Sequence, residues 1–62
     1  MIKKIVVLGA GISGVGAAVL AKKKGFNVFV SDKGIITEAN KKVLLNNEIE
    51  WEEGKHTLQH IL

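Results

Sequence analysis

A glycine-rich turn is the first part of the chain whose residue types suggest chemistry: Gly9-Ala10-Gly11-Ile12-Ser13-Gly14 fits the pattern G-x-G-x-x-G. In this pattern the first glycine permits a tight turn, the second lets an anionic ligand approach the backbone, and the third lets a helix pack close to a strand. The amide N–H groups at the start of that helix, with the positive end of its dipole, bind phosphate. Ser13 adds a hydroxyl donor. The pattern predicts a diphosphate site, and the alternative is a tight turn without a ligand.

Asp32 is the second candidate, because it follows the glycine turn at about the spacing where an acidic residue binds ribose hydroxyls. The alternative is a local one, since Ser31-Asp32-Lys33-Gly34 is also a good turn sequence in which the aspartate caps the backbone. Turn and acid together favour a ligand that carries ribose and a diphosphate. They do not distinguish a redox cofactor from a nucleotide-activated sugar.

These residues need a strand and a helix to position them. The apolar run 5–8 predicts a strand buried inside a parallel sheet. A helix is expected from Ile12 to Lys24, with an inward stripe formed by Ile12, Val15, Ala18 and Val19, and Gly25 is expected in the left-handed position after it. Residues 26–31 return to strand character.

A second unit of the same kind follows. Thr37 is expected to cap a helix that ends near Asn46 or Asn47, with Val43 and Leu44 or Leu45 on its inner side. Ile49 and Trp51 alternate with glutamates, which predicts a half-exposed strand with the Trp51 ring packed under a helix. The spacing of Leu58, Ile61 and Leu62 indicates a third helix that is cut short.

The order β-α-β-α-β plus a truncated helix predicts an α/β, Rossmann-like three-layer fold with a parallel sheet in the order 3-2-1. The first strand lies centrally in such folds, and the strands for its other side are missing. We therefore expect residues 1–62 to be an incomplete N-terminal nucleotide-binding domain. As an isolated piece it should be marginally stable, or pair through the open edge of its first strand.

Composition excludes several classes of protein. The chain has no Cys and a net charge of +3, and its lysine run 22–24 suits the end of a helix better than a nucleic-acid site. No apolar run is long enough to cross a bilayer, and the N-terminal run leads into a glycine turn rather than a cleavage site. We expect a cytoplasmic protein with no nucleic-acid or membrane partner.

No catalytic or metal-binding residues are expected. His56 and His60 share a helical spacing, but two ligands without a third make a poor metal site. Strand alternation explains Glu50, Glu52 and Glu53 without an acid pair. Ser13 has no His or acid partner nearby in the sequence, so it is not predicted to be a nucleophile.

Two stretches carry a resemblance to a known family. Residues 6–18, VVLGAGISGVGAA, and residues 25–32, GFNVFVSD, resemble the N-terminal domain of the Mur ligases, and the similarity continues through residues 49–57. Within the family the chain is most similar to the members that add D-glutamate. The resemblance implies that this domain binds UDP, with the diphosphate on Gly11, Ile12, Ser13 and Gly14. It places the uridine near Asp32 and Lys33.

The resemblance also implies the rest of the enzyme. A full-length monomer would join D-glutamate to UDP-N-acetylmuramoyl-L-alanine in bacterial peptidoglycan synthesis, using ATP and Mg²⁺, through an acyl phosphate. That chemistry needs a G-x-x-x-x-G-K-[ST] loop, which this chain lacks. The central ATP-binding and C-terminal domains are therefore absent here, and the chain alone is expected to be non-catalytic.

Two alternatives share the glycine turn. FAD-dependent oxidases and hydroxylases open similarly, but they usually end the second strand with Glu and continue with an Arg-rich segment, whereas this chain has Asp32 and no Arg. An NAD-dependent dehydrogenase is the other alternative, because Asp32 would suit the NAD ribose. The glycine turn does not separate the three classes. The residues after it favour the ligase family.

Overall fold

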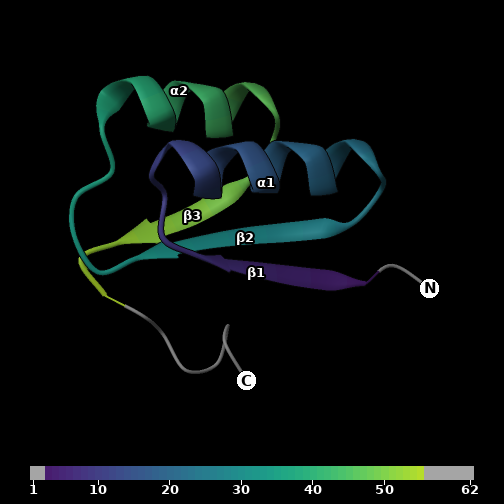
Figure 1. Ribbon diagram of the computed structural model, residues 1–62, viewed down its shortest axis with the longest axis horizontal. Coiled ribbons are helices and arrows are strands. Elements are labelled where there is room, and N and C mark those ends of the chain that lie inside the picture. The colour runs from purple at the N-terminus through teal and green to yellow at the C-terminus, as the bar shows by residue number, and fades with distance from the viewer. Residues whose placement is uncertain (1–2, 56–62) are drawn as a thin grey trace.

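The structure is a computed structural model that describes residues 3–55. It contains β1 (Lys4–Leu8), α1 (Ile12–Lys23), β2 (Asn27–Asp32), α2 (Glu38–Asn46) and β3 (Glu50–Glu53). Figure 1 shows the predicted alternation of strands and helices. His56, His60 and the third helix predicted near the C-terminus lie outside the described residues.

The three strands form one parallel sheet in the order β1-β2-β3, as predicted. Val6 of β1 aligns with Phe29, and Val30 of β2 aligns with Trp51. Because parallel strands end at the same edge of a sheet, the residues after Leu8, Asp32 and Glu53 converge there. This edge carries the glycine turn.

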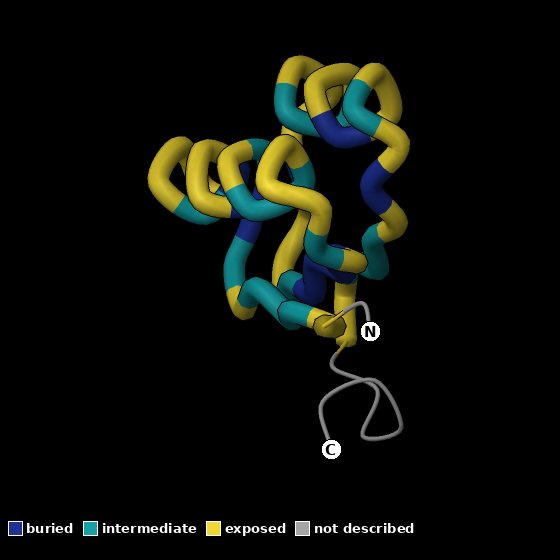
Figure 2. Tube along the Cα trace, turned by 90° about the vertical axis from the view of Figure 1, so that its right-hand side faces the viewer, coloured by how far each residue is buried: buried dark blue, intermediate teal, exposed yellow. Residues whose placement is uncertain are grey.

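Both helices lie on the same face of the sheet (Figures 1 and 2). The α/β, Rossmann-like class is thereby confirmed, and the described residues supply two of its three expected layers. Between the layers lies one apolar core, in which Val30, Ala18 and Leu44 are completely buried. The other core members are Ala10, Val15, Val28, Ile36 and Ile49.

Local sequence signals mark the end of α1 and the start of α2, as expected. Gly25 has a φ of 92° after α1, and its N–H donates to the carbonyl of Lys22. The Thr37 hydroxyl oxygen accepts a hydrogen bond from the backbone N–H of Asn40 at 3.2 Å, which caps α2. The expected inward place is confirmed for Leu44, which is buried, and is wrong for Val43, which is exposed, as is Leu45.

The expected place of Ile12 on the inner stripe of α1 is wrong, because its side chain is 90% exposed. Helical spacing alone put it with Val15 and Ala18, which are buried. Ile12 is the first residue of the helix, however, and at that point the chain has only just left the sheet, so nothing in the described part of the chain packs over it.

Within residues 3–55, no helix is both long and apolar enough to cross a membrane. Over the same residues no cluster of three His, Cys, Asp or Glu side chains is placed to bind a metal ion.

Candidate functional site

The three glycines of the turn each have a distinct geometry. Gly9 has a φ of 105°, a conformation that favours glycine, and its N–H donates to the carbonyl of Ser31 at 2.7 Å. A Cβ atom on Gly14 would overlap the carbonyl group of Gly9, so the helix packs against the turn with no room for a side chain. The predicted tight turn and close helix packing are both confirmed.

Gly11 has open space at the position of a Cβ atom, whereas the same position at Gly14 is crowded. Apart from Gly11 and its two chain neighbours, no atom of the described residues lies within 4 Å of a Cβ built on Gly11, and its φ of −73° is ordinary for any residue. Glycine at this position is therefore not required by the fold of the described residues. The free space is what an approaching anion would need.

The N-terminus of α1 begins directly beyond this space. Gly11 is the N-cap and brings no capping side chain, and the first turn contains no acidic residue. The first helical hydrogen bond runs from the N–H of Val15 to the carbonyl of Gly11 at 2.9 Å. The amides of Ile12, Ser13 and Gly14 therefore precede the hydrogen-bonded part of the helix, where they suit an external anion.

Asp32 connects the end of β2 to the glycine turn. One carboxylate oxygen, Oδ2, accepts a hydrogen bond from the N–H of Ala10 at 2.7 Å, and Oδ1 accepts one from the N–H of Gly34 at 2.8 Å. The bond to Gly34 is the turn-capping interaction that was the local alternative for this residue. Lys33 is exposed immediately beside it. The sequence-predicted residues thus lie at one edge of the sheet, joined through Asp32.

Asn40 is a residue of the site that the sequence did not point to. Its side-chain Nδ2 donates to the carbonyl oxygen of Ala10 at 2.9 Å, across a sequence separation of 30 residues. No local motif marks this bond, because it depends on how α2 docks beside the turn. A capping pattern explains only the other bond of Asn40, from its backbone to Thr37.

An ion pair secures α2 to the sheet nearby. Lys41 Nζ lies 3.0 Å from Glu53 Oε2, and Glu53 Oε1 accepts a hydrogen bond from the N–H of Ile36 at 3.0 Å. The hydrogen bond with Lys41 lowers the pKa of Glu53, assisted by the bond from Ile36. The hydrogen bond with Glu53 raises the pKa of Lys41. Strand alternation alone did not predict this structural use of Glu53.

The neighbouring glutamate, Glu52, also has a structural partner. The hydroxyl oxygen of Ser31, which is completely buried, lies 2.7 Å from Glu52 Oε2 and 3.1 Å from the carbonyl oxygen of Lys55. This group joins β2 to the end of β3. It contributes to the shape of the sheet edge rather than to a chemical site.

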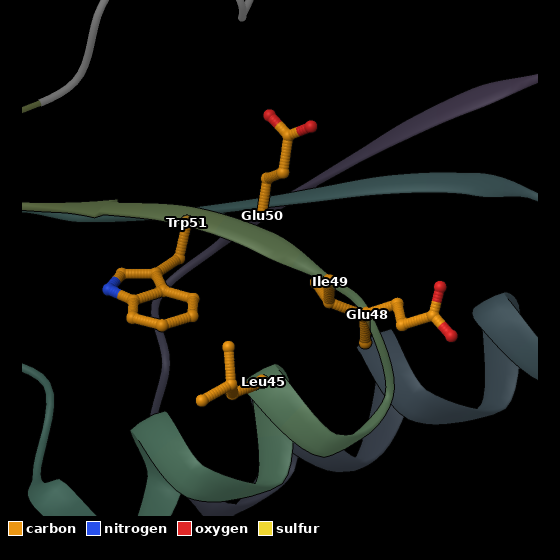
Figure 3. A pocket seen from close by; sticks show the side chains of 5 residues that line it. All are labelled: Leu45, Glu48, Ile49, Glu50 and Trp51. Carbon is orange, nitrogen blue, oxygen red and sulfur yellow. The ribbon is translucent and has the colours of Figure 1, made fainter.

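A hollow of about 430 Å³ lies elsewhere, between α2 and β3 (Figure 3). In Figure 3 the Trp51 indole and Leu45 lie on the same side of β3, while the Glu50 carboxylate points to the opposite side. Trp51 packs against the core, as predicted from the alternation. This hollow is remote from the glycine turn and has no convergent polar groups, so we do not assign the nucleotide site to it.

A parallel sheet, a glycine turn after its first strand and a helix N-terminus facing open space define a Rossmann-like α/β domain. The comparisons identify which one. The family model described as "MurD N-terminal domain" matches residues 4–61, so this chain belongs to that family.

Curated relatives agree with this assignment. Proteins named "UDP-N-acetylmuramoylalanine--D-glutamate ligase" match at 62% identity over 55 residues in Christiangramia forsetii, 60% over 60 residues in Bacteroides fragilis and 52% over 62 residues in Cytophaga hutchinsonii. These matches cover 89%, 97% and 100% of this chain, respectively. The chain spans only 12–14% of the length of these relatives. No solved structure gave a significant match.

Proposed function

We propose that this chain is the UDP-binding N-terminal part of a ligase that adds D-glutamate to UDP-N-acetylmuramoyl-L-alanine. Family membership and the shared name of the relatives support this function. The observation that carries the binding role is the unobstructed N-terminus of α1: a glycine N-cap, no acidic residue in the first turn and free space above Gly11. A diphosphate suits such a site because it accepts hydrogen bonds and carries negative charge.

The proposed ligand spans two parts of the sheet edge. Its diphosphate lies on the amides of Gly11, Ile12, Ser13 and Gly14, and the Ser13 hydroxyl adds a donor. Its uridine lies near Asp32, the last residue of the adjacent strand β2, and Lys33, which follows it. The bonds from Ala10 and Gly34 to Asp32 keep these two parts in a fixed relation.

Catalysis is assigned to the rest of the full-length protein. We propose a central ATP-binding domain and a C-terminal domain that follow residues 1–62, and an incomplete N-terminal domain in this chain. ATP, bound with Mg²⁺, transfers its γ-phosphoryl group to the L-alanine carboxylate and leaves as ADP. The amine of D-glutamate then attacks the acyl carbon and displaces inorganic phosphate, which forms the amide bond. We place this reaction in the cytoplasm, in peptidoglycan synthesis, and expect a monomeric enzyme.

Thermal protection of the full-length protein tests the choice of ligand. A ligand that binds only the native state raises the melting temperature by mass action. UDP and UDP-N-acetylmuramoyl-L-alanine should do so, whereas FAD and NAD should not. Release of phosphate from ATP that requires both the UDP-linked substrate and D-glutamate tests the reaction. A flavin spectrum in the purified protein, or protection by NAD alone, would favour an oxidoreductase and overturn the proposal.

A further inference from the structure

The backbone of Ala10, in the middle of the glycine turn, is held by side chains rather than by the sheet. Ala10 is 3% exposed, its N–H donates to Asp32 Oδ2 at 2.7 Å, and its carbonyl accepts from Asn40 Nδ2 at 2.9 Å. Buried backbone polar groups need partners, and secondary structure usually supplies them. Here two side chains from different elements replace it, so they determine how this part of the turn is oriented.

The carbonyl of Ala10 belongs to the same peptide unit as the N–H of Gly11. A trans peptide is planar, and its C=O and N–H point in opposite directions. By holding the carbonyl of Ala10, Asn40 therefore directs the N–H of Gly11 away from α2. Gly11 is also the residue beside which the open space described above lies.

Two contacts hold the part of α2 that carries Asn40 in place. Its own N–H donates to the hydroxyl oxygen of Thr37 at 3.2 Å, so it lies in the capped first turn of α2. The next residue, Lys41, pairs with Glu53 of β3 at 3.0 Å. The side-chain amide that contacts Ala10 is thus part of an anchored helix end, and its position does not depend on a ligand.

We propose that Asn40 is a positioning residue for nucleotide binding, which sets the direction of the Gly11 amide before the diphosphate arrives. This inference rests on the proposed UDP-binding function. Donors that are already oriented bind more tightly because ordering them costs no free energy at the moment of binding. Asn40 need not touch the ligand to have this effect.

Asn40→Ala in the full-length protein tests the inference, with Asn47→Ala as the matched control. Asn47 also lies at an end of α2 and also donates its Nδ2 to a backbone carbonyl, that of Val43 at 2.8 Å, but at the end remote from the glycine turn. Loss of one preorganised hydrogen bond should raise the Kd for UDP up to about tenfold in Asn40→Ala. The KM for ATP should be unchanged, and Asn47→Ala should bind UDP like the wild type.

A second variant, Asn40→Leu, keeps a side chain of similar size without a donor, and a melting curve for each variant identifies those that fold. If either folded Asn40 variant binds UDP as tightly as Asn47→Ala does, the inference is overturned. An equal rise in the KM for ATP would also overturn it, because a general structural defect would then explain the loss. If the wild type binds no UDP, the proposed function itself fails, and this result is distinct from the other two.

Discussion

The carbonyl group of Gly9 occupies the space that a side chain on Gly14 would need. Gly14→Ala should therefore force α1 away from the glycine turn and lower the melting temperature of the full-length protein, since overpacking a tight site typically costs about 1–3 kcal/mol. Gly16→Ala is the matched control in the same helix. Apart from the neighbouring backbone of α1, a Cβ there meets no atom of the described residues within 4 Å, so the substitution should stabilise the protein by about 0.5–1 kcal/mol. Equal melting temperatures for the two variants would contradict the packing.

Asp32 should contribute to stability even without a ligand. In Asp32→Asn only one acceptor oxygen remains, while the structure uses one carboxylate oxygen for Ala10 and the other for Gly34. The unpaired amide should cost about 1–3 kcal/mol. Lys33→Ala is the control, because Lys33 is exposed and is expected to act on the ligand only. Thermal melting without nucleotide separates the two, and an Asp32→Asn variant as stable as Lys33→Ala would exclude the proposed link.

The pair Lys41–Glu53 should make stability depend on pH in a defined direction. The pKa of Glu53 is lowered in the folded state by its hydrogen bond with Lys41, so its contribution is present above its ordinary pKa and is lost as the pH falls through the lowered value. The pKa of Lys41 is raised, so its contribution is lost only as the pH rises through that raised value. The pair therefore stabilises the protein throughout the neutral range.

Glu53→Gln isolates this effect, because the amide oxygen can still accept the bond from Ile36. The variant should melt below the wild type at neutral pH, and the difference should shrink below about pH 4. Glu50→Gln, on the exposed side of the same strand, serves as the control. A difference for Glu53→Gln that stays constant down to acidic pH would argue against a stabilising ion pair.

Local features of the fold were predictable from the sequence because neighbouring residues determine them. Gly25 ends α1 because the chain there needs a positive φ, which glycine adopts easily. Thr37 begins α2 because its hydroxyl accepts a hydrogen bond from Asn40 within the first turn. The parallel order of the strands follows from their alternation with helices. Ile12 was misplaced because periodicity does not tell where along a helix the core begins.

The contacts that assemble the site were less predictable. Asn40 and Ala10 are 30 residues apart, and their bond exists only once α2 has docked. The alternation made Glu53 one of several strand glutamates without a particular role. In the structure it pairs with Lys41 and accepts a hydrogen bond from the N–H of Ile36. Asp32 was expected to contact the ligand, and the structure adds a role in holding the turn. Its contact with uridine stays a prediction.

The central claim is that the diphosphate of a UDP-linked substrate binds the backbone amides of residues 11–14. Calorimetric titration of the full-length protein with UDP and with uridine tests this most directly, in the wild type, Gly11→Val and the control Gly16→Ala. Space around Gly11 should let the Gly11→Val variant fold, while its side chain blocks the phosphate. We predict that the wild type and Gly16→Ala bind UDP much more tightly than uridine. Gly11→Val should bind UDP no more tightly than uridine. If a folded Gly11→Val variant binds UDP as tightly as the wild type, the claim is contradicted.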